Sequence, residues 1–526
     1  MSAFRRALED LSGRAASTNS RRWLFVPYDQ LSDRIGPLSR EPPGSLGIVL
    51  VECPAKAARR PYHKQKLALV LANLRSFAIE QASRGVRVRH LVAPAGYDSA
   101  LSPLAAELGP LHMMEAAERE LREELAPLIA RGELVVLPHE GWLTSDSDFE
   151  RASADGFAPW RMDRFYAAVR RRTGILMKKD RPLGGRMSLD AENRKSWRGQ
   201  PPVPTPPRFE PDSITREVGD LIEQRYAQHP GRLELTMLPA TRADAVQLLD
   251  WAMSECLPLF GPYEDAMSVR STSLFHTRLS ALINLHRLTP REVLDRALGL
   301  HLPLSSQEGF VRQILGWREF VRHVHRRTDG FRMRPTARGQ QPLSAREGDP
   351  LPAAFWGEAS GLACLDRVVA DVWSEGYGHH ITRLMILSNI ATLLEASPRE
   401  LTDWFWAAYV DAYDWVVEPN VLGMGTYALG DLMTTKPYVA GAAYIHRMSD
   451  YCAECAFDPK KNCPITPLYW SFLARHSDEL AGNSRMLVPL SALQKRRPEQ
   501  RVSDASVFAT VRQALGRGEK LHPGVR

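Results

Sequence analysis

Short apolar runs alternate with helical patterns in the first third of the chain. Trp23–Val26 and Leu46–Glu52 are apolar runs of the kind that forms buried strands. Lys66–Gly85 has apolar residues three and four positions apart and ends at a glycine, which predicts a helix. Val86–Val92 and Glu133–Pro138 are further strand-like runs. Strands that alternate with helices predict an α/β domain with an open, doubly wound parallel sheet.

A nicotinamide site on this sheet is not supported. None of the predicted strands is followed by Gly-x-Gly-x-x-Gly. Open sheets bind ligands outside the carboxyl ends of their strands. Tyr28, Glu52 and His63 lie near such ends, although a structural role is equally consistent with each.

The pattern changes after Phe157. The next stretch is basic and helical, and residues 184–212 then lose all periodicity, with glycines and prolines that predict a long connection. From Ile214 onward the periodicity is helical, with Thr289 and Ser397 as expected N-caps because each precedes a proline. We therefore expect an α/β domain at 20–155, a helix and loop at 156–213 and an all-α domain at 214–526.

Composition adds constraints on the partner and compartment. The 526 residues are 44% hydrophobic, but no apolar run approaches the roughly 18 residues of a membrane span. Six cysteines in so long a chain do not indicate a disulfide scaffold, and the amino terminus lacks the apolar stretch of a secretory signal, so we expect a cytoplasmic protein without a membrane partner. A net charge of +7 favours an anionic partner such as nucleic acid, although many enzymes are mildly basic.

Four cysteines are the most specific candidate ligands. Cys452 and Cys455 form a Cys-x-x-Cys pair, Cys463 follows eight residues later directly before a proline, and Cys364 lies far upstream. Iron–sulfur clusters need four converging thiolates, often with a proline after the last one. Zinc accepts the same ligands. The spacing alone leaves a cluster, zinc or no metal open.

The segments around these cysteines resemble the iron–sulfur branch of the bacterial photolyase and cryptochrome family, the prokaryotic (6-4) photolyases. The resemblance is carried by GRMSLDAENRKSW, EDAM, EGFVRQILGWREF, SEGYGHHITRLMILSNIATLL, LTDWFWAAYVDAYDWVVEPNVLGMGTYALGD and KPYVAGAAYIHRMSDYC, and it extends from about Thr173 to Phe472. It implies an α/β antenna domain followed by an all-α FAD-binding catalytic domain. It also implies a monomeric lyase that binds UV-damaged DNA and repairs (6-4) photoproducts with light.

The resemblance assigns flavin contacts to nine residues: Tyr263, His276, Thr277, Ser280, Gln313, Arg318, Arg383, Asp411 and Glu418. Arg383 would pair with Asp411 across the edge of the isoalloxazine. Without the resemblance, the Ser and Thr residues are equally ordinary helix caps. Six positions after Asp411, relatives carry a polar or acidic residue, whereas this chain has Val417. Either the loop shifts so that Glu418 serves there, or flavin protonation and any Mg²⁺ site differ.

Further roles follow from the same resemblance. His380, with His379 as its neighbour, would donate a proton to the lesion, since imidazole titrates near neutrality. Trp356 and Trp404 would relay electrons; Phe405 stands where relatives carry tyrosine, and Trp406 and Tyr409 lie nearby. The expected DNA or lesion contacts are Arg194, Trp317, Met424, Lys436 and Tyr438, with Asp190 as a polar or Mg²⁺-associated group.

The cofactors implied are FAD, a [4Fe–4S] cluster on Cys364, Cys452, Cys455 and Cys463, a lumazine antenna (6,7-dimethyl-8-ribityllumazine) and Mg²⁺. The segment between the last two cysteines is shorter than in many relatives, but four ligands remain. Val417 favours an alternative function, a cryptochrome-like blue-light photoreceptor with little or no repair. A different class of protein would be a metal-stabilised nucleic-acid-binding module without photochemistry.

Overall fold

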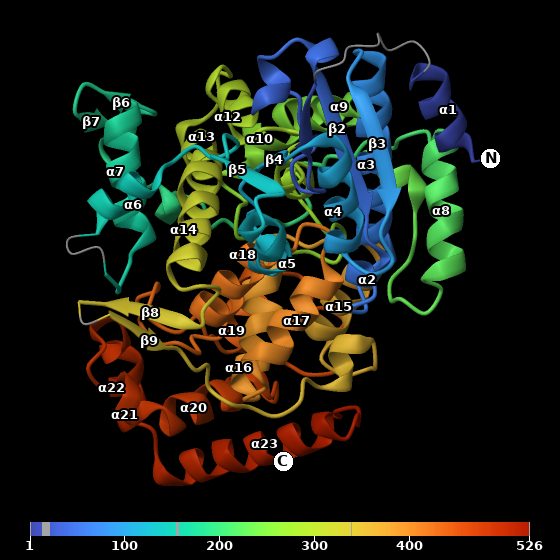
Figure 1. The fold of residues 1–526 in the computed structure, drawn as a ribbon. Helices are drawn as coiled ribbons and strands as arrows, with labels where there is room; N and C mark the ends of the chain where they lie inside the picture. The colour runs from blue at the N-terminus through green and yellow to red at the C-terminus, as the bar shows by residue number, and fades with distance from the viewer. Residues whose placement is uncertain (1, 13–20, 154–156, 338, 525–526) are drawn as a thin grey trace.

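The computed structural model describes residues 2–12, 21–153, 157–337 and 339–524, and a five-stranded sheet forms the core of its first part (Figure 1). The strands are β1 (Arg22–Phe25), β2 (Leu46–Glu52), β3 (Arg87–Val92), β4 (Leu111–Met114) and β5 (Leu134–Leu137). All pairings are parallel, in the order β3-β2-β1-β4-β5. The four predicted strands are confirmed, and β4 is an addition that the sequence did not indicate.

Helices cover this sheet in two groups. One group is α1 (Ala3–Ser12), α3 (Lys64–Ser83) and α8 (Ser213–Arg225), which pack on one another; the other is α4 (Tyr97–Leu108) with α5 (Arg119–Ala130). The predicted helix at Lys66–Gly85 is therefore confirmed as α3, and the short α2 (Pro54–Ala57) precedes it. Phe4 anchors α1 through edge contacts with His90, 4.8 Å between ring centroids. The expected domain limits at 20, 155 and 156 fall outside the described residues.

The connection begins with α6 (Asp146–Ala152) and α7 (Met162–Thr173). A two-residue ribbon, β6 (Met177–Lys178) with β7 (Arg181–Pro182), and the short turns η3 (Leu183–Gly185) and η4 (Asp190–Glu192) follow. The chain then runs without helix or strand to α8. This course matches the loss of periodicity in the sequence.

The second half is helical, as predicted. Its elements are η5 (Leu235–Met237), α9 (Arg242–Trp251), η6 (Ala252–Cys256), α10 (Leu257–Phe260), α11 (Ser280–Asn284), α12 (Pro290–Leu298), α13 (Leu304–Val311), η7 (Arg312–Arg318), α14 (Glu319–Arg327), η8 (Ala353–Trp356), α15 (Ala363–Glu375), η9 (Thr382–Ser388), α16 (Asn389–Leu393), α17 (Pro398–Ala408), α18 (Asp414–Glu418), η10 (Pro419–Gly425), α19 (Ala442–Met448), α20 (Ile465–Arg475), α21 (Ser477–Leu480), η11 (Ser484–Met486), α22 (Leu487–Gln494) and α23 (Pro498–Gly516). Thr289 and Ser397 cap α12 and α17 through their side chains, as expected. One hairpin, β8 (Met333–Thr336) with β9 (Gly339–Pro342), was not predicted. In the ranges described, no helix is long and apolar enough to cross a bilayer.

Four segments of this half, η6, η7, η9 and η10, are π-helical. A π turn inserts an extra residue and redirects the side chains that follow it, and such turns occur frequently at functional sites. Three of the four carry expected site residues: Gln313 and Trp317 on η7, Arg383 on η9, and Met424 on η10. The wide turns therefore mark the region where function is expected.

Candidate active site

The buried ion pair between Arg383 and Asp411 is the centre of the candidate site. Two parallel hydrogen bonds of 3.0 Å join the guanidinium to the carboxylate. Ser280 Oγ donates to Asp411 Oδ2 at 2.6 Å, and Asn284 Nδ2 donates to the Asp411 carbonyl oxygen at 2.9 Å. Burial alone would raise the pKa of Asp411, but the Arg383 charge and these hydrogen bonds outweigh it and lower that pKa. The site therefore holds a fixed negative charge opposite a fixed positive one.

A cavity of about 420 Å³ lies beside this pair. It is lined by the hydroxyls of Ser271, Thr272 and Ser273 and by two ion pairs. Arg278 pairs with Glu375 at 2.8 Å and Arg367 with Asp371 at 2.9 Å. Leu274 and Arg278 have positive φ values of 45° and 57°, which are rare for such residues and frequent at functional sites. The run of hydroxyl residues Ser271–Ser273 could have indicated this lining from the sequence, but none of the three is among the expected flavin contacts.

The cavity suits a pyrophosphate with an attached ribityl chain, since hydroxyls and arginines bind phosphate oxygens. Of the residues expected around it, Ser280 lies at the adjacent ion pair. Tyr263 instead packs on Phe275, with ring centroids 5.1 Å apart, and His276 lies against His379. Buried polar atoms without a partner among the described residues include the Tyr409 hydroxyl and His379 Nδ1, as expected where a ligand belongs.

Three histidines form a stack next to the ion pair. The rings of His276 and His379 are parallel within 9° at 4.4 Å, and His380 meets His276 at 5.3 Å. Their ligand atoms lie within 4.8 Å of one another. The in-plane lone pairs of two stacked rings run parallel, so they do not converge on one tetrahedral ion.

Burial, together with the positive charges nearby, keeps these imidazoles neutral. The pKa of His276 is lowered to about 3 by burial and by His380, and that of His379 lies well below its usual value for the same reasons. The pKa of His380 is lowered to about 4 by the surrounding protein and by the charges of Arg312 and Arg383. Yet 41% of the His380 side chain is exposed, so it faces whatever enters the site.

Acidic groups from the connection and the helical half converge on the histidines. Glu264 accepts hydrogen bonds from Asn193 at 2.5 Å and Gln313 at 2.6 Å. Asp265 lies 3.9 Å from His380 Nε2, and burial with the nearby Glu264 and Asp190 raises its pKa to about 7. Arg194 pairs with Asp190 and lies 4.0 Å from Asp265. The expected DNA-side residues of the connection thus reach the histidine stack.

Three tryptophans form a path from the surface to the interior. Trp356 is 47% exposed and stacks on Trp373, with 5.6 Å between ring centroids and 19° between planes. Trp373 meets the buried Trp404 edge-on at 5.8 Å. Both Trp373 Nε1 and Trp404 Nε1 donate to the Phe355 carbonyl oxygen, at 3.0 and 2.8 Å. Sequence reasoning named Trp356 and Trp404 but missed Trp373, which joins them.

The four expected cysteine ligands line one small apolar pocket. Burial raises the pKa of Cys364, and the nearby Cys463, Cys452 and Cys455 raise it further, so the four thiols share one electrostatic environment. The structure therefore brings the four predicted ligands together in one pocket.

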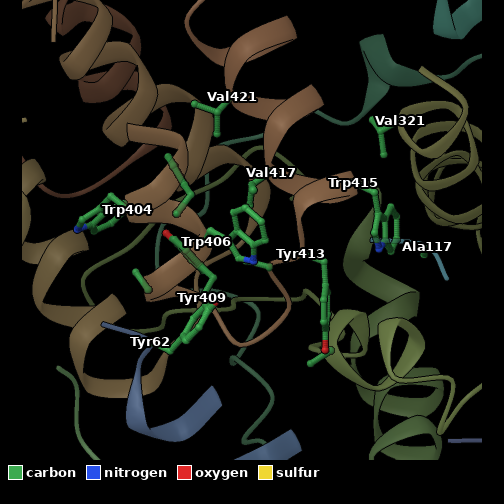
Figure 2. Close-up of a cluster of buried hydrophobic side chains, with 14 of the residues drawn as sticks. Tyr62, Ala117, Val321, Trp404, Trp406, Tyr409, Tyr413, Trp415, Val417 and Val421 are labelled. Carbon is green, nitrogen blue, oxygen red and sulfur yellow. The ribbon is translucent and has the colours of Figure 1, made fainter. Parts of the chain in front are cut away.

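Two expected flavin contacts lie elsewhere. Glu418 accepts from His325 and Arg399, at 3.1 and 3.2 Å, rather than approaching Asp411. Arg318 is buried with its guanidinium 4.2 Å from the centre of the Trp142 ring, and burial lowers its pKa to about 10. Val417 is buried and belongs to the apolar cluster drawn in Figure 2 with Trp406 and Tyr409. The Glu418 carboxylate is thus held by His325 and Arg399.

The expected lesion contacts differ in exposure and surroundings. Trp317 is half-buried and meets Phe320 edge-on at 6.1 Å. Met424 and Tyr438 are half-buried, and Lys436 is exposed. Lys436 and Tyr438 lie within electrostatic reach of Arg194.

A second cavity, of about 330 Å³, lies at the carboxyl ends of β1 and β2, between the sheet and the helical half. Tyr28 and Glu52 line it, as expected, whereas His63 caps α3. The Tyr28 and Tyr413 rings are stacked at 6.3 Å, and neither hydroxyl has a partner among the described residues. Two free phenols facing an apolar cavity fit a planar ligand with polar edges.

Comparison with known proteins identifies the family. A model of the family "Deoxyribodipyrimidine photo-lyase-related protein" matches residues 24–237. The chain is 35% identical to a (6-4) photolyase of Agrobacterium fabrum over 487 residues, which cover 89% of this chain and 94% of the relative. It is also 31% identical, over 118 residues, to an uncharacterised protein of Acanthamoeba polyphaga mimivirus, covering 22% of this chain and 91% of that protein. The chain belongs to the photolyase and cryptochrome family, on the branch of the (6-4) photolyases.

Among solved structures, a class III photolyase from Agrobacterium tumefaciens is 15% identical with a TM-score of 0.49, covering 95% of this chain and 99% of that one. That score is too low to add to the fold argument. Family membership supports a photolyase-type flavoprotein function for the chain.

Proposed function

We propose that the protein is a light-driven DNA repair enzyme for (6-4) pyrimidine–pyrimidone photoproducts. The observation that carries this proposal is the position of His380, exposed on a buried histidine stack, one turn from the Arg383–Asp411 pair and 3.9 Å from Asp265. A lesion at His380 would lie next to both a proton donor and the expected cofactor. The (6-4) photolyase relative supports the same reaction.

His380 is the proposed proton donor. At pH 7 the imidazole is neutral, because its pKa is lowered to about 4. A negative charge developing on the lesion would raise this pKa, so the neutral ring, whose side chain is 41% exposed, would first take up a proton from solvent. It would then pass that proton to the lesion. His379 and His276 pack behind the ring and hold it in place.

FAD fits the hydroxyl-lined cavity and the ion pair beside it. When bound and reduced, it would supply the light absorption and the electron for repair. Ser271–Ser273 and Arg278 would hold the pyrophosphate, and Arg383 with Asp411 would fix the ring edge. Thr277 and Gln313 would contribute at the rim, with Gln313 held by Glu264.

Arg194, Lys436 and Tyr438 would contact the DNA backbone near the lesion, and Trp317 and Met424 would line its pocket. Mg²⁺ would sit with Asp190 and Asp265, the crowded carboxylates beside His380, whose mutual repulsion a cation relieves.

Electrons would pass inward along Trp356, Trp373 and Trp404 to keep the cofactor reduced. The last step would bypass Phe405, which lacks a redox-active ring, and Tyr409, whose ring lies 3.9 Å below the Arg383 guanidinium. A cation so close disfavours oxidation of the phenol.

A [4Fe–4S] cluster is the proposed occupant of the cysteine pocket, because four thiols line it and Cys463 directly precedes a proline. A lumazine antenna is the proposed occupant of the cavity at β1 and β2, where Tyr28 and Tyr413 would hold its polar edges. The cluster would lie among apolar side chains and four thiols, and the antenna would lie beside the two tyrosine hydroxyls.

The test is light-dependent repair by the purified, reduced protein. One oligonucleotide would carry a defined (6-4) photoproduct, and a second would carry a cyclobutane dimer. Repair of the first alone is expected, and His380→Ala should keep FAD and lesion binding but lose repair. Repair of neither lesion by protein that holds FAD would overturn the proposal.

Val417 favours one second candidate, a cryptochrome-like blue-light photoreceptor. The position lies in an apolar cluster, and Glu418 points to His325 and Arg399. A photoreceptor would show light-driven changes of the flavin spectrum without repair of either lesion.

A further inference from the structure

Two neighbouring apolar side chains at the start of α22 are unusually exposed. Val488 is 81% exposed and Leu487 is 59% exposed, while the adjacent Met486 is buried at 3%. Exposed apolar side chains that lie together mark interaction sites. Met486 anchors the turn, so Leu487 and Val488 are held in solvent by a fixed backbone.

Hydrogen bonds connect this turn to the proposed lesion pocket. Asn483 Nδ2 donates to the Thr435 carbonyl oxygen at 2.8 Å, and Asn483 Oδ1 accepts from Arg485 N at 3.0 Å. On the other side, Thr434 Oγ1 donates to the Gly423 carbonyl oxygen at 3.2 Å. Gly423 directly precedes Met424. The consecutive residues Thr434 and Thr435 therefore connect the turn before α22 to η10.

Basic residues flank the apolar pair. Arg485 is exposed two residues before Leu487, and Lys495 and Arg497 are exposed just after α22. Lys436 lies within electrostatic reach of both Arg485 and Arg194. The nearby acid Glu479 is paired with Arg346 at 2.8 Å. Lys436 thus lies between Arg194, which pairs with Asp190, and Arg485 beside the exposed pair.

We propose that Leu487 and Val488 form an apolar wedge that enters the DNA duplex next to the flipped lesion, with Arg485 and Lys436 on the flanking phosphates. This inference rests on the proposed function. Flipping a base pair out leaves unstacked neighbours, and proteins that open duplexes insert apolar side chains between base steps. Charge complementarity selects DNA over another protein as the partner of this surface.

The wedge predicts a difference between double-stranded and single-stranded substrates. Only a duplex must be held open, so the wedge matters for duplex DNA and not for an unpaired strand that carries the same lesion. The experiment uses the full chain with FAD and measures affinity for a (6-4) lesion in both forms. A 2-aminopurine opposite the lesion reports base opening by its fluorescence.

The test variant is Leu487→Ser/Val488→Ser, and Val502→Ser is the matched control because Val502 is 71% exposed on α23. The double variant should bind the duplex lesion about tenfold more weakly. Its affinity for the single strand should stay within about twofold of the wild type. The 2-aminopurine fluorescence should fall together with the duplex affinity. Leu487→Ile/Val488→Ile should restore the fluorescence and the duplex affinity.

Three results would overturn the wedge: unchanged duplex affinity, equal loss on both substrates, or the same loss in Val502→Ser. A wild-type dimer that the double variant dissociates would assign the pair to a contact between copies of the chain. Repair of the single-stranded lesion by the wild type is the reference. If the wild type does not repair the single-stranded lesion, the proposed function is wrong. The wedge, which rests on that function, is then wrong as well.

Discussion

One carbonyl oxygen, that of Phe355, fixes the position of Trp373. The Phe355 oxygen accepts hydrogen bonds from both Trp373 and Trp404, which fixes the two indoles 5.8 Å apart, while Trp356 stacks on the outer face of Trp373. Because electron transfer slows steeply with distance, we expect Trp373→Phe to slow blue-light reduction of the bound flavin by an order of magnitude or more. Reduction by dithionite and flavin content should not change.

The control for this prediction is Trp251→Phe, a half-buried tryptophan in another core cluster. Time-resolved absorption would follow the tryptophan radical, which a merely structural defect would not alter selectively. Equal photoreduction in Trp373→Phe and the wild type would remove Trp373 from the path.

Glu52 couples stability to acid pH. Its carboxylate lies 2.6 Å from Arg75 Nε and 3.0 Å from His90 Nε2. Burial alone would raise the pKa of Glu52, but the hydrogen bonds from His90 and Arg75 lower it from 4.5 to about 2. Since the folded value is the lower one, the group stabilises the fold above pH 4.5, and this contribution is lost as the pH falls from 4.5 towards 2.

We therefore expect Glu52→Gln to lose on the order of 3 kcal/mol at pH 7, and the loss should shrink as the pH falls. Urea unfolding at pH 7 and pH 3 measures both values. The control is Glu41→Gln, which breaks a half-exposed pair with Arg22 and should change little. The same loss of unfolding free energy in Glu52→Gln at pH 7 and at pH 3 would contradict the prediction.

Much of the candidate site could be predicted only through the resemblance to the photolyase family. The resemblance paired Arg383 with Asp411, and they are hydrogen-bonded as expected. Trp373 carried no such signal, because it matches an ordinary packing residue until the fold places it on Phe355. Glu418 was expected near the flavin only by its neighbourhood in sequence, and the helical turn of α18 directs it to His325.

At the scale of elements, long and regular segments were predictable. The strand β2 and the helix α3 have seven and twenty residues with clear patterns. The strand β4 reads LHMM, in which a histidine interrupts the apolar run, and the hairpin β8–β9 reads MRPT and GQQP, without apolar alternation. The π turns also escaped prediction, because one extra residue barely changes a helical pattern.

The cysteine set ties several elements together. Cys364 lies on α15, Cys452 and Cys455 lie in the loop after α19, and Cys463 precedes α20. If these thiols hold a cluster, losing one ligand should unfold this corner, since metal binding and folding are coupled. We expect Cys452→Ala to lose its iron and most of its soluble yield, measured by metal analysis and expression.

The matched control is Cys256→Ala. Cys256 is fully buried but lies apart from the four, and burial raises the pKa of its thiol. This variant should keep its iron and its solubility with a small loss of stability. Iron retained in Cys452→Ala would refute the ligand assignment.

At the scale of the molecule, the two halves share side-chain hydrogen bonds that no local pattern predicts. Lys66 on α3 is buried, and its ammonium donates to the carbonyl oxygens of Trp406 and Ala412 at 2.7 and 2.6 Å. Burial holds the pKa of Lys66 well below its usual value. The sequence identified Lys66 only as a helical residue, because its partners lie more than 300 residues away.

Farther along α3, Arg287 of the helical half binds Glu80 through two hydrogen bonds of 2.8 and 2.6 Å and Asn73 at 3.0 Å. Arg287 is 3% exposed, so its removal leaves polar partners without a donor. With α3 bonded in this way at both ends, we expect the sheet and the helices to unfold as one cooperative unit in calorimetry.

Arg287→Met should cost about 3 kcal/mol and broaden or split that transition. The control is Arg84→Met, which breaks a half-exposed pair with Asp33 and hydrogen bonds to Gln81 and Leu38 and should change stability by less than about 0.5 kcal/mol. A single sharp transition of unchanged midpoint in Arg287→Met would mean that apolar packing alone joins the two halves.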